Sequence, residues 1–213
     1  LSLLNILNQI LVYIFRNFKM INPIELKKKY LRSREKLFSS LLNSNDGVTF
    51  NKNHTMLVDS VVKDLVLGIQ RQFPVSDFSL IAVGGYGRQD LSPKSDVDLL
   101  FLYKKSNKNI RGFITALNNS LWDLGLEVGI SFLTLKQVII DSKKDIKTVT
   151  KFAESRHLIG DEDYYGEFVR SIKILIGKLN SLKLSEKKLL ELVGRHDYYL
   201  GIKSNLEPQI KEG

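Results

Sequence analysis

Two acidic residues, two positions apart, carry the most chemistry in this sequence. Asp96 and Asp98 open the hydrophobic run DVDLLFLY, which has the composition of a β-strand. Residues i and i+2 of a strand point to the same face, so the two carboxylates are expected side by side. Like charges so close repel unless a cation lies between them. Mg²⁺ suits this role, because it prefers oxygen ligands and is commonly held by carboxylates together with substrate phosphates.

A glycine pair precedes the carboxylates along the chain. Gly84 and Gly85 directly follow the hydrophobic run FSLIAV. Without Cβ atoms, the backbone at this point can approach a triphosphate closely and offer its N–H groups. Arg88 and Ser95, in the polar loop that follows, are expected to add charge and hydrogen bonds to the phosphates. Asp90 lies in the same loop and could orient Arg88.

Each half of this pattern also has an ordinary structural explanation. A glycine pair before polar residues is often only a turn, and an Asp-x-Asp sequence is often a solvated strand end. Their combination, bracketed by two hydrophobic runs, favours a binding site. The loop is not a Walker A loop, because no G-K-[ST] follows, and it lacks the GxGxxG and helix of a Rossmann fingerprint.

Glu127 is the best-placed candidate for a third carboxylate. It lies near the start of a strand predicted at 126–133, where it shares a face with Gly129 and Ser131. The other face is apolar and is expected to meet the core. An exposed glutamate at a strand end is the alternative explanation, and the sequence does not choose between the two.

The remaining patterns predict an α+β fold, in which helices flank a small mixed β-sheet and a helical segment follows. Predicted helices cover 23–42, 53–73, 111–124, 135–158, 162–180 and a segment from Ser185, and predicted strands cover the runs at 78–85, 96–103 and 126–133. The chain divides into an N-terminal helical region at 1–50, a core at 51–140 and a helical segment at 141–213. Basic residues of this last segment, such as Arg156, are expected on the surface.

Composition narrows the class of protein. The chain has 213 residues and no cysteine, which excludes a disulfide framework and fits a cytoplasmic protein. Its formal charge of +9 suits an anionic ligand such as a nucleotide, or reflects a solvated lysine-rich surface. The apolar segment at 1–20 is interrupted by polar residues, so it predicts an amphipathic helix and no membrane partner. No nucleic-acid partner is expected, because basic and aromatic residues are not interleaved.

A glycine pair followed about ten residues later by two aspartates with a hydrophobic residue between them resembles the active-site pattern of the nucleotidyltransferase superfamily of DNA polymerase beta. The segment GGYGRQDLSPKSDVDLL at 84–100 is similar to GGYGR-x-[ED]-L-x-P-x-SD-[IV]-DLL of the bacterial PII uridylyltransferase/uridylyl-removing enzymes. Two further blocks, LWDLGLEVG at 121–129 and NLEPQIKEG at 205–213, resemble the same family. The chain departs from the family at Ile130, where His is usual, and at Leu133, where Arg is usual.

The resemblance implies a sheet of nucleotidyltransferase type, with its core at 51–140, and a specific reaction. UMP would pass from UTP to a tyrosine of the PII nitrogen-signalling protein, with release of pyrophosphate and with Mg²⁺ as cofactor. The predicted catalytic residues are Asp96 and Asp98, the metal ligands are Asp96, Asp98 and Glu127, and the nucleotide-binding residues are Gly84, Gly85, Arg88 and Ser95. The family continues into an HD hydrolase domain and paired ACT domains, so this chain is expected to be a piece of a larger enzyme or a truncated product.

The sequence leaves three alternatives open. The chain could be another nucleotidyltransferase of the superfamily, with a small molecule, a different protein or RNA as acceptor. It could be a catalytically silent regulatory module that keeps the fold, since Ile130 and Leu133 replace polar groups of the family. A nucleic-acid-binding module is the third alternative. The native start, Leu1 or Met20, is also undecided.

Overall fold

A computed structural model describes residues 23–44 and 46–178 of the chain. Three sequence-based expectations lie outside these residues: the amphipathic helix at 1–20, the helix from Ser185 and the block at 205–213. Within the described ranges, no helix has the length and apolar character needed to cross a membrane.

The centre of the fold is a four-stranded mixed sheet with the strand order β3-β2-β1-β4. Its strands are β1 (Phe78–Ala82), β2 (Val97–Tyr103), β3 (Val128–Leu133) and β4 (Arg156–Gly160). Strand β1 runs antiparallel to both of its neighbours, whereas β2 and β3 are parallel. The predicted fold class, a small mixed sheet flanked by helices, is confirmed.

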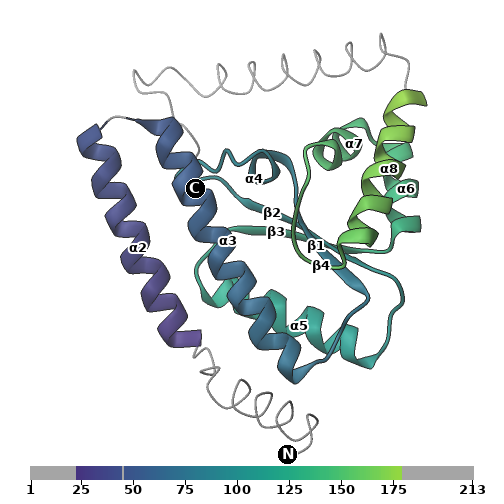
Figure 1. Cartoon of the computed structure of the whole chain (residues 1–213), viewed down its shortest axis with the longest axis horizontal. Helices are drawn as coiled ribbons and strands as arrows, with labels where there is room; N and C mark the ends of the chain where they lie inside the picture. The colour runs from purple at the N-terminus through teal and green to yellow at the C-terminus, as the bar shows by residue number, and fades with distance from the viewer. Residues whose placement is uncertain (1–22, 45, 179–213) are drawn as a thin grey trace, which may run out of the picture.

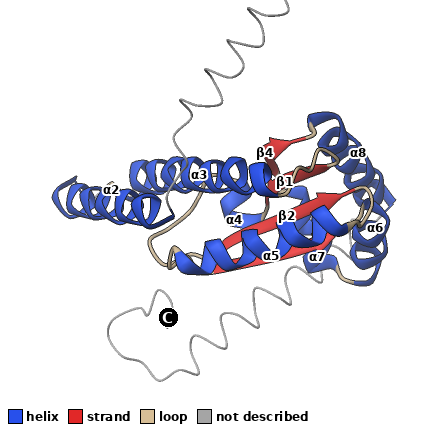
Figure 2. Ribbon diagram, turned by 90° about the horizontal axis from the view of Figure 1, so that it is seen from below, coloured by secondary structure: helices blue, strands red, loops and turns tan. Residues whose placement is uncertain are grey.

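Helices cover both faces of this sheet. They are α2 (Pro23–Ser44), α3 (Gly47–Gln72), α4 (Gly84–Gly87), α5 (Lys108–Asp123), α6 (Leu135–Lys144), α7 (Ile146–Ala153) and α8 (Glu162–Lys178). Helices α3 and α5 lie on one face, α6, α7 and α8 lie on the other, and α2 runs alongside α3 (Figures 1 and 2). Helix α3 begins earlier than predicted because Asp46 caps it and accepts a hydrogen bond from the backbone N–H of Thr49 at 3.0 Å.

Two hydrophobic cores follow from the alternation of side chains along the strands. Leu99 and Phe101 of β2 enter the core beneath α3 and α5, while Leu100 and Leu102 enter the core beneath α6, α7 and α8. Phe101 stacks on Phe78 of β1, with the ring centroids 4.9 Å apart. Because both faces are buried, the central strands are held firmly, and the ends that carry the glycine pair and the carboxylates are fixed with them.

The prediction of one helix over 135–158 is wrong. The chain breaks at Asp145, which ends α6 and caps α7 by accepting hydrogen bonds from the backbone N–H groups of Lys147 and Thr148. Residues 156–160 then form β4, which pairs with β1. The run RHLIG has little strand pattern of its own, and its conformation comes from a free edge of β1 far away in the sequence.

Arg156, expected on the surface, is partly buried. Its guanidinium donates two hydrogen bonds to the carboxylate of Asp59 in α3, at 2.6 and 3.1 Å, and one to the carbonyl of Tyr86, at 3.2 Å. The same guanidinium lies 5.5 Å from the centroid of the Tyr86 ring. Burial keeps the pKa of Tyr86 well above its ordinary value, so the phenol stays neutral. These contacts tie β4, α3 and the α4 turn together.

Candidate active site

The carboxylate of Asp98 lies in a narrow slot between two glycines. Strand β2 pairs with β3 so that Asp98 faces Gly129, and a Cβ atom added at Gly129 would lie 2.8 Å from Asp98 Oδ1. A Cβ atom added at Gly84 would lie 3.5 Å from Asp98 Oδ2. The absence of side chains at both positions therefore leaves room for this carboxylate and for a ligand beside it.

The glycine pair begins one turn of helix, α4, rather than ending the strand predicted at 78–85. Val83 is extended, and Gly84 then adopts a φ of +61°, which reverses the chain sharply. The backbone N–H of Val83 donates to the carbonyl of Asp98 at 3.1 Å, so the turn is fastened to β2 at the predicted site. Since the first N–H groups of a helix have no partner within it, those of Gly84 and Gly85 suit an anion.

A lysine already contacts the Asp98 carboxylate. Lys151 Nζ of α7 lies 2.7 Å from Asp98 Oδ1, and both side chains are partly exposed. The Lys151 side chain also passes over the glycine turn, with its Cγ atom 3.7 Å from the position of an added Gly84 Cβ. The structure thus places the Lys151 ammonium group between the glycine turn and the Asp98 carboxylate, where the sequence predicts the triphosphate and the metal ion.

Asp96 and Glu127 lie at the starts of two neighbouring parallel strands. Asp96 directly precedes β2, and Glu127 directly precedes β3, whose first residues Val97 and Val128 are paired. The backbone N–H of Val97 donates to the carbonyl of Glu127 at 2.7 Å, which holds the two strand ends together. Among the described residues, no three Asp, Glu or His side chains form a group that could hold a metal ion, so Glu127 as the third ligand stays a prediction.

Arg88 and Ser95 take different positions in the loop between β1 and β2. Arg88 forms an ion pair with Glu154, the residue that ends α7, and both side chains are nearly half exposed. Asp90 does not orient Arg88 as predicted; it accepts a hydrogen bond from Asn51 at 2.7 Å. Ser95 shares a hydrogen bond with Ser92 and lines a cavity together with Glu127.

The structure therefore brings Gly84 against the Asp98 carboxylate and places Asp96 at the same strand end. Gly85 follows Gly84 in the turn and lies near Arg88, which pairs with Glu154. Sequence reasoning missed Lys151 and the role of Gly129. Lys151 has no distinguishing local signal among the 32 basic residues of the chain. The signal for Gly129 was present, since a glycine within a strand often marks a close approach of another group.

Comparisons with known proteins agree with this geometry. A family model for the nucleotidyltransferase domain matches residues 46–161. Bifunctional uridylyltransferase/uridylyl-removing enzymes from Ralstonia nicotianae, Nitrosospira multiformis and Idiomarina loihiensis are 35, 30 and 36% identical over 74, 92 and 69% of this chain. The matched parts are 18, 22 and 17% of those relatives, so the chain spans a minor share of their length. A toxin–antitoxin crystal structure with AMP-PNP covers 62% of this chain and 97% of its own, at 16% identity and a TM-score of 0.36, which is too distant for a functional conclusion.

The glycine turn, the Asp98 slot and the family match over more than half of the sequence define the class: this chain belongs to the nucleotidyltransferase domain family. Within that family it is similar to the bifunctional uridylyltransferase/uridylyl-removing enzymes, as the three sequence blocks predict.

Replacing Gly129 with alanine is expected to lower nucleotidyl transfer by about tenfold or more, because small displacements of reacting groups are costly. The new Cβ atom would lie 2.8 Å from Asp98 Oδ1, so the carboxylate must leave its slot. Gly129 is exposed, and the free energy of unfolding should change by less than about 1 kcal/mol. The matched control is Ser131→Ala, on the same face of β3. Equal transfer rates for wild type and Gly129→Ala would show that the slot has no role.

Proposed function

We propose that this chain transfers UMP from UTP to a tyrosine hydroxyl of the PII signalling protein in the cytoplasm and releases pyrophosphate. One observation carries the proposal: the Asp98 carboxylate lies in a slot between two glycines, and the ammonium group of Lys151 contacts it at 2.7 Å. The choice of UMP as the transferred group rests on similarity to relatives that are named uridylyltransferases. The PII acceptor comes from the resemblance of the three sequence blocks.

The residues of the slot fit a divalent cation. Asp98 offers carboxylate oxygens beside an open glycine position, and Asp96 adds a second carboxylate at the same strand end. Such an all-oxygen donor set suits Mg²⁺. We assign Asp96 and Asp98 as its ligands, with Glu127 joining them after a movement of its side chain. When bound, the cation would neutralise charge on the phosphates and lower the pKa of the attacking hydroxyl.

The chain's own groups then position the triphosphate. The backbone N–H groups of Gly84 and Gly85 and the side chains of Lys151 and Arg88 face the β- and γ-phosphates, which places the α-phosphorus near the aspartates. The tyrosine oxygen forms a bond to the α-phosphorus while the bond to the bridging oxygen of the β-phosphate breaks. Pyrophosphate leaves with the electron pair, and the hydroxyl proton passes to a carboxylate oxygen of Glu127. Catalysis by these residues is mainly positioning and charge neutralisation.

The departure from the family at Ile130 does not reach the slot. Ile130 pairs with Leu99, and its side chain packs against the core beneath α3 and α5, on the face opposite to Asp98. Leu133, the other departure, lies on the same face as Gly129, but it pairs with Leu102, four residues along β2 from Asp98, and packs in the core beneath α6, α7 and α8. Neither departure pairs with Asp98, which supports an active enzyme over a silent module.

Transfer assays with labelled nucleotides test the proposal. The chain is incubated with UTP, ATP or CTP labelled at the α-phosphate, with and without purified PII and Mg²⁺. Label is expected on PII only with UTP, and EDTA should abolish the signal. A tyrosine-to-phenylalanine change at the modified position of PII should remove the labelling.

The other outcomes identify the alternatives. Labelling with ATP or CTP, or of an acceptor other than PII, would indicate a different nucleotidyltransferase of the superfamily. Calorimetry that detects no Mg²⁺-dependent UTP binding, together with the absence of any transfer, would indicate a silent module and refute the proposed activity.

A further inference from the structure

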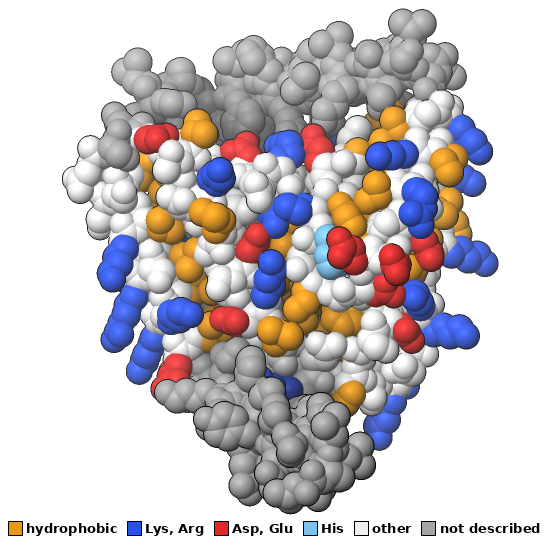
Figure 3. All heavy atoms as spheres, in the orientation of Figure 1, with side chains coloured by type: hydrophobic (Ala, Val, Ile, Leu, Met, Phe, Trp, Pro, Cys, Tyr) orange, Lys and Arg blue, Asp and Glu red, His pale blue; other side chains and the backbone are white. Residues whose placement is uncertain are grey.

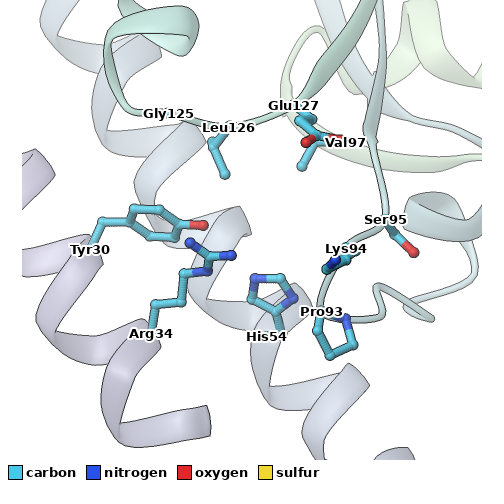
Figure 4. Close-up of a pocket in the computed structure, with 10 residues that line it drawn as sticks. All are labelled: Tyr30, Arg34, His54, Pro93, Lys94, Ser95, Val97, Gly125, Leu126 and Glu127. Atoms are coloured by element: carbon cyan, nitrogen blue, oxygen red, sulfur yellow. The ribbon is translucent and has the colours of Figure 1, made fainter. Parts of the chain in front are cut away.

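A cavity of about 330 Å³ opens beside Ser95, Val97 and Glu127, at the starts of β2 and β3 (Figure 4). Its walls come from α2, α3, the loop before β2 and the turn before β3. We call it the Arg34 pocket and define it by Tyr30, Arg34, His54, Lys94, Ser95 and Glu127. Figure 4 shows Tyr30, Arg34 and His54 pointing toward one another from the two helices.

Arg34 differs from the other basic residues of α2. Five of the six, namely Lys27, Lys28, Lys29, Arg32 and Lys36, are exposed. Arg34 instead continues the inward stripe of Leu26 and Tyr30, at a spacing of four residues, and is partly buried. Within 23–44 and 46–178, its guanidinium has no carboxylate partner and its buried Nε has no hydrogen-bond partner. The guanidinium also lies over the Phe38 ring, 5.2 Å from its centroid, which stabilises the charge only in part. Because a partly buried cation without a carboxylate is costly, this geometry predicts that an anionic group binds here.

His54 adds a hydrogen-bond acceptor to the same pocket. Its Nδ1 lies 3.1 Å from the carbonyl of Leu91, and because a carbonyl only accepts, Nδ1 carries the proton. The Nε2 atom then presents a lone pair, and no described residue donates to it. Burial also lowers the pKa of His54, which favours this neutral form. The pocket thus offers cationic donors and one buried acceptor, which suits a ligand with both an anion and an N–H or O–H group.

The Arg34 pocket adjoins the Asp96 end of the carboxylate pair. Ser95 and Val97, the neighbours of Asp96 on both sides, line it, and so does Glu127. Gly84 and Lys151 lie instead at the Asp98 end. Phosphoryl transfer places the attacking and leaving oxygens roughly in line, on opposite sides of the phosphorus. Val97 and Leu126 belong to the core beneath α3 and α5, so the pocket lies on the sheet face opposite to Asp98. If pyrophosphate leaves toward Gly84 and Lys151, an acceptor held in the Arg34 pocket would reach the α-phosphate around the starts of β2 and β3, where Asp96 and Glu127 lie.

We propose that the Arg34 pocket is the acceptor subsite and binds an acidic peptide segment, whose carboxylate pairs with Arg34 while a neighbouring hydroxyl reaches the α-phosphate. This inference rests on the proposed function. Charge complementarity supports it: Lys and Arg side chains gather along the edge of the molecule formed by α2 (Figure 3), and Lys94 adds a further cation. A peptide fits better than a nucleic acid, because the aromatic residue of the pocket, Tyr30, is only 2% exposed and offers no surface for base stacking.

A pair of tyrosine peptides tests the inference directly. One heptapeptide carries a central tyrosine flanked by glutamates, and the other carries glutamines in their place. With α-labelled UTP and Mg²⁺, the wild-type chain should label the glutamate peptide with a kcat/KM about tenfold higher or more, as expected for a partly desolvated charge pair. Arg34→Gln should remove this preference, and Lys94→Gln should reduce it. Arg32→Gln is the matched control, since Arg32 is an exposed residue of the same helix and does not line the pocket.

Several outcomes would overturn the inference. One is equal labelling of both peptides by the wild-type chain; another is an unchanged preference in Arg34→Gln. Labelling of a short oligoribonucleotide in place of both peptides would assign a nucleic-acid acceptor instead. A disturbed fold would lower UTP binding and the labelling of both peptides alike, so it is distinguishable from loss of preference. If the wild-type chain binds no Mg²⁺–UTP, the proposed function fails, and calorimetry of the two peptides without nucleotide still tests the pocket.

Discussion

Asp98→Asn is expected to lower UMP transfer by on the order of a thousandfold or more, since electrostatic stabilisation of the charge at the reacting phosphate contributes most to catalysis of this kind. The amide keeps the size of the carboxylate but loses its negative charge, and its nitrogen cannot bind a cation. Asp96→Asn should have the same effect, because both carboxylates are needed at the strand end. Transfer of labelled UMP to PII, measured under single-turnover conditions, gives the rates.

The fold should survive both substitutions. Asp98 and its partner Lys151 are 31 and 39% exposed, and an ion pair of that exposure stabilises a protein by about 0–1 kcal/mol. Urea unfolding of Asp98→Asn should therefore lie within about 1 kcal/mol of wild type. Asp123→Asn, at the exposed end of α5, is the control for loss of one charge. Rates like wild type in either active-site variant would refute the assignment of the carboxylate pair.

The sequence could predict the glycine pair and the carboxylates, because both lie in one short segment, 84–98. Gly84 and Asp98 are joined by a single loop between two apolar strands, so their spacing alone brings them together when β1 and β2 pair. Strand alternation likewise puts Gly129 on the face of Asp98 once β3 is recognised. Local pattern and local pairing are sufficient for these conclusions.

The parts that could not be predicted depend on segments far apart in the chain. Lys151 reaches Asp98 across 53 residues, and Arg88 meets Glu154 across 66. Both contacts require α7 to lie against the α4 turn, which depends on the break at Asp145 and on the pairing of β4 with β1. Since the sequence over 135–158 continues an apolar periodicity without a proline or glycine, the one local sign of that break is Asp145, a residue type that favours N-caps. The Arg34 pocket was missed for the same reason, because α2 meets the loop before β2 only in the folded chain.

Lys151→Met is expected to change metal binding and nucleotide use in opposite directions. In the free protein, the Lys151 ammonium group and a divalent cation compete for Asp98 Oδ1, where Nζ already lies at 2.7 Å. Removing the ammonium group should therefore tighten the binding of Mn²⁺, the probe cation, to the chain without nucleotide. With UTP present, the lysine is expected to move from Asp98 to the phosphates above Gly84, over which its stem already lies.

The loss of that phosphate contact should raise the KM for UTP about tenfold or more, as expected for a hydrogen bond between charged groups. Lys151→Arg should restore part of the nucleotide affinity, because the guanidinium keeps the charge and the donors. Lys143→Met, an exposed lysine at the end of α6, controls for the change in net charge. If Lys151 has only a structural role, Lys151→Met should lower the free energy of unfolding and leave the Mn²⁺ affinity and the KM for UTP unchanged. Tighter Mn²⁺ binding together with a higher KM is therefore the pair of results that distinguishes a lysine exchanging between carboxylate and phosphate from one that only fills the slot.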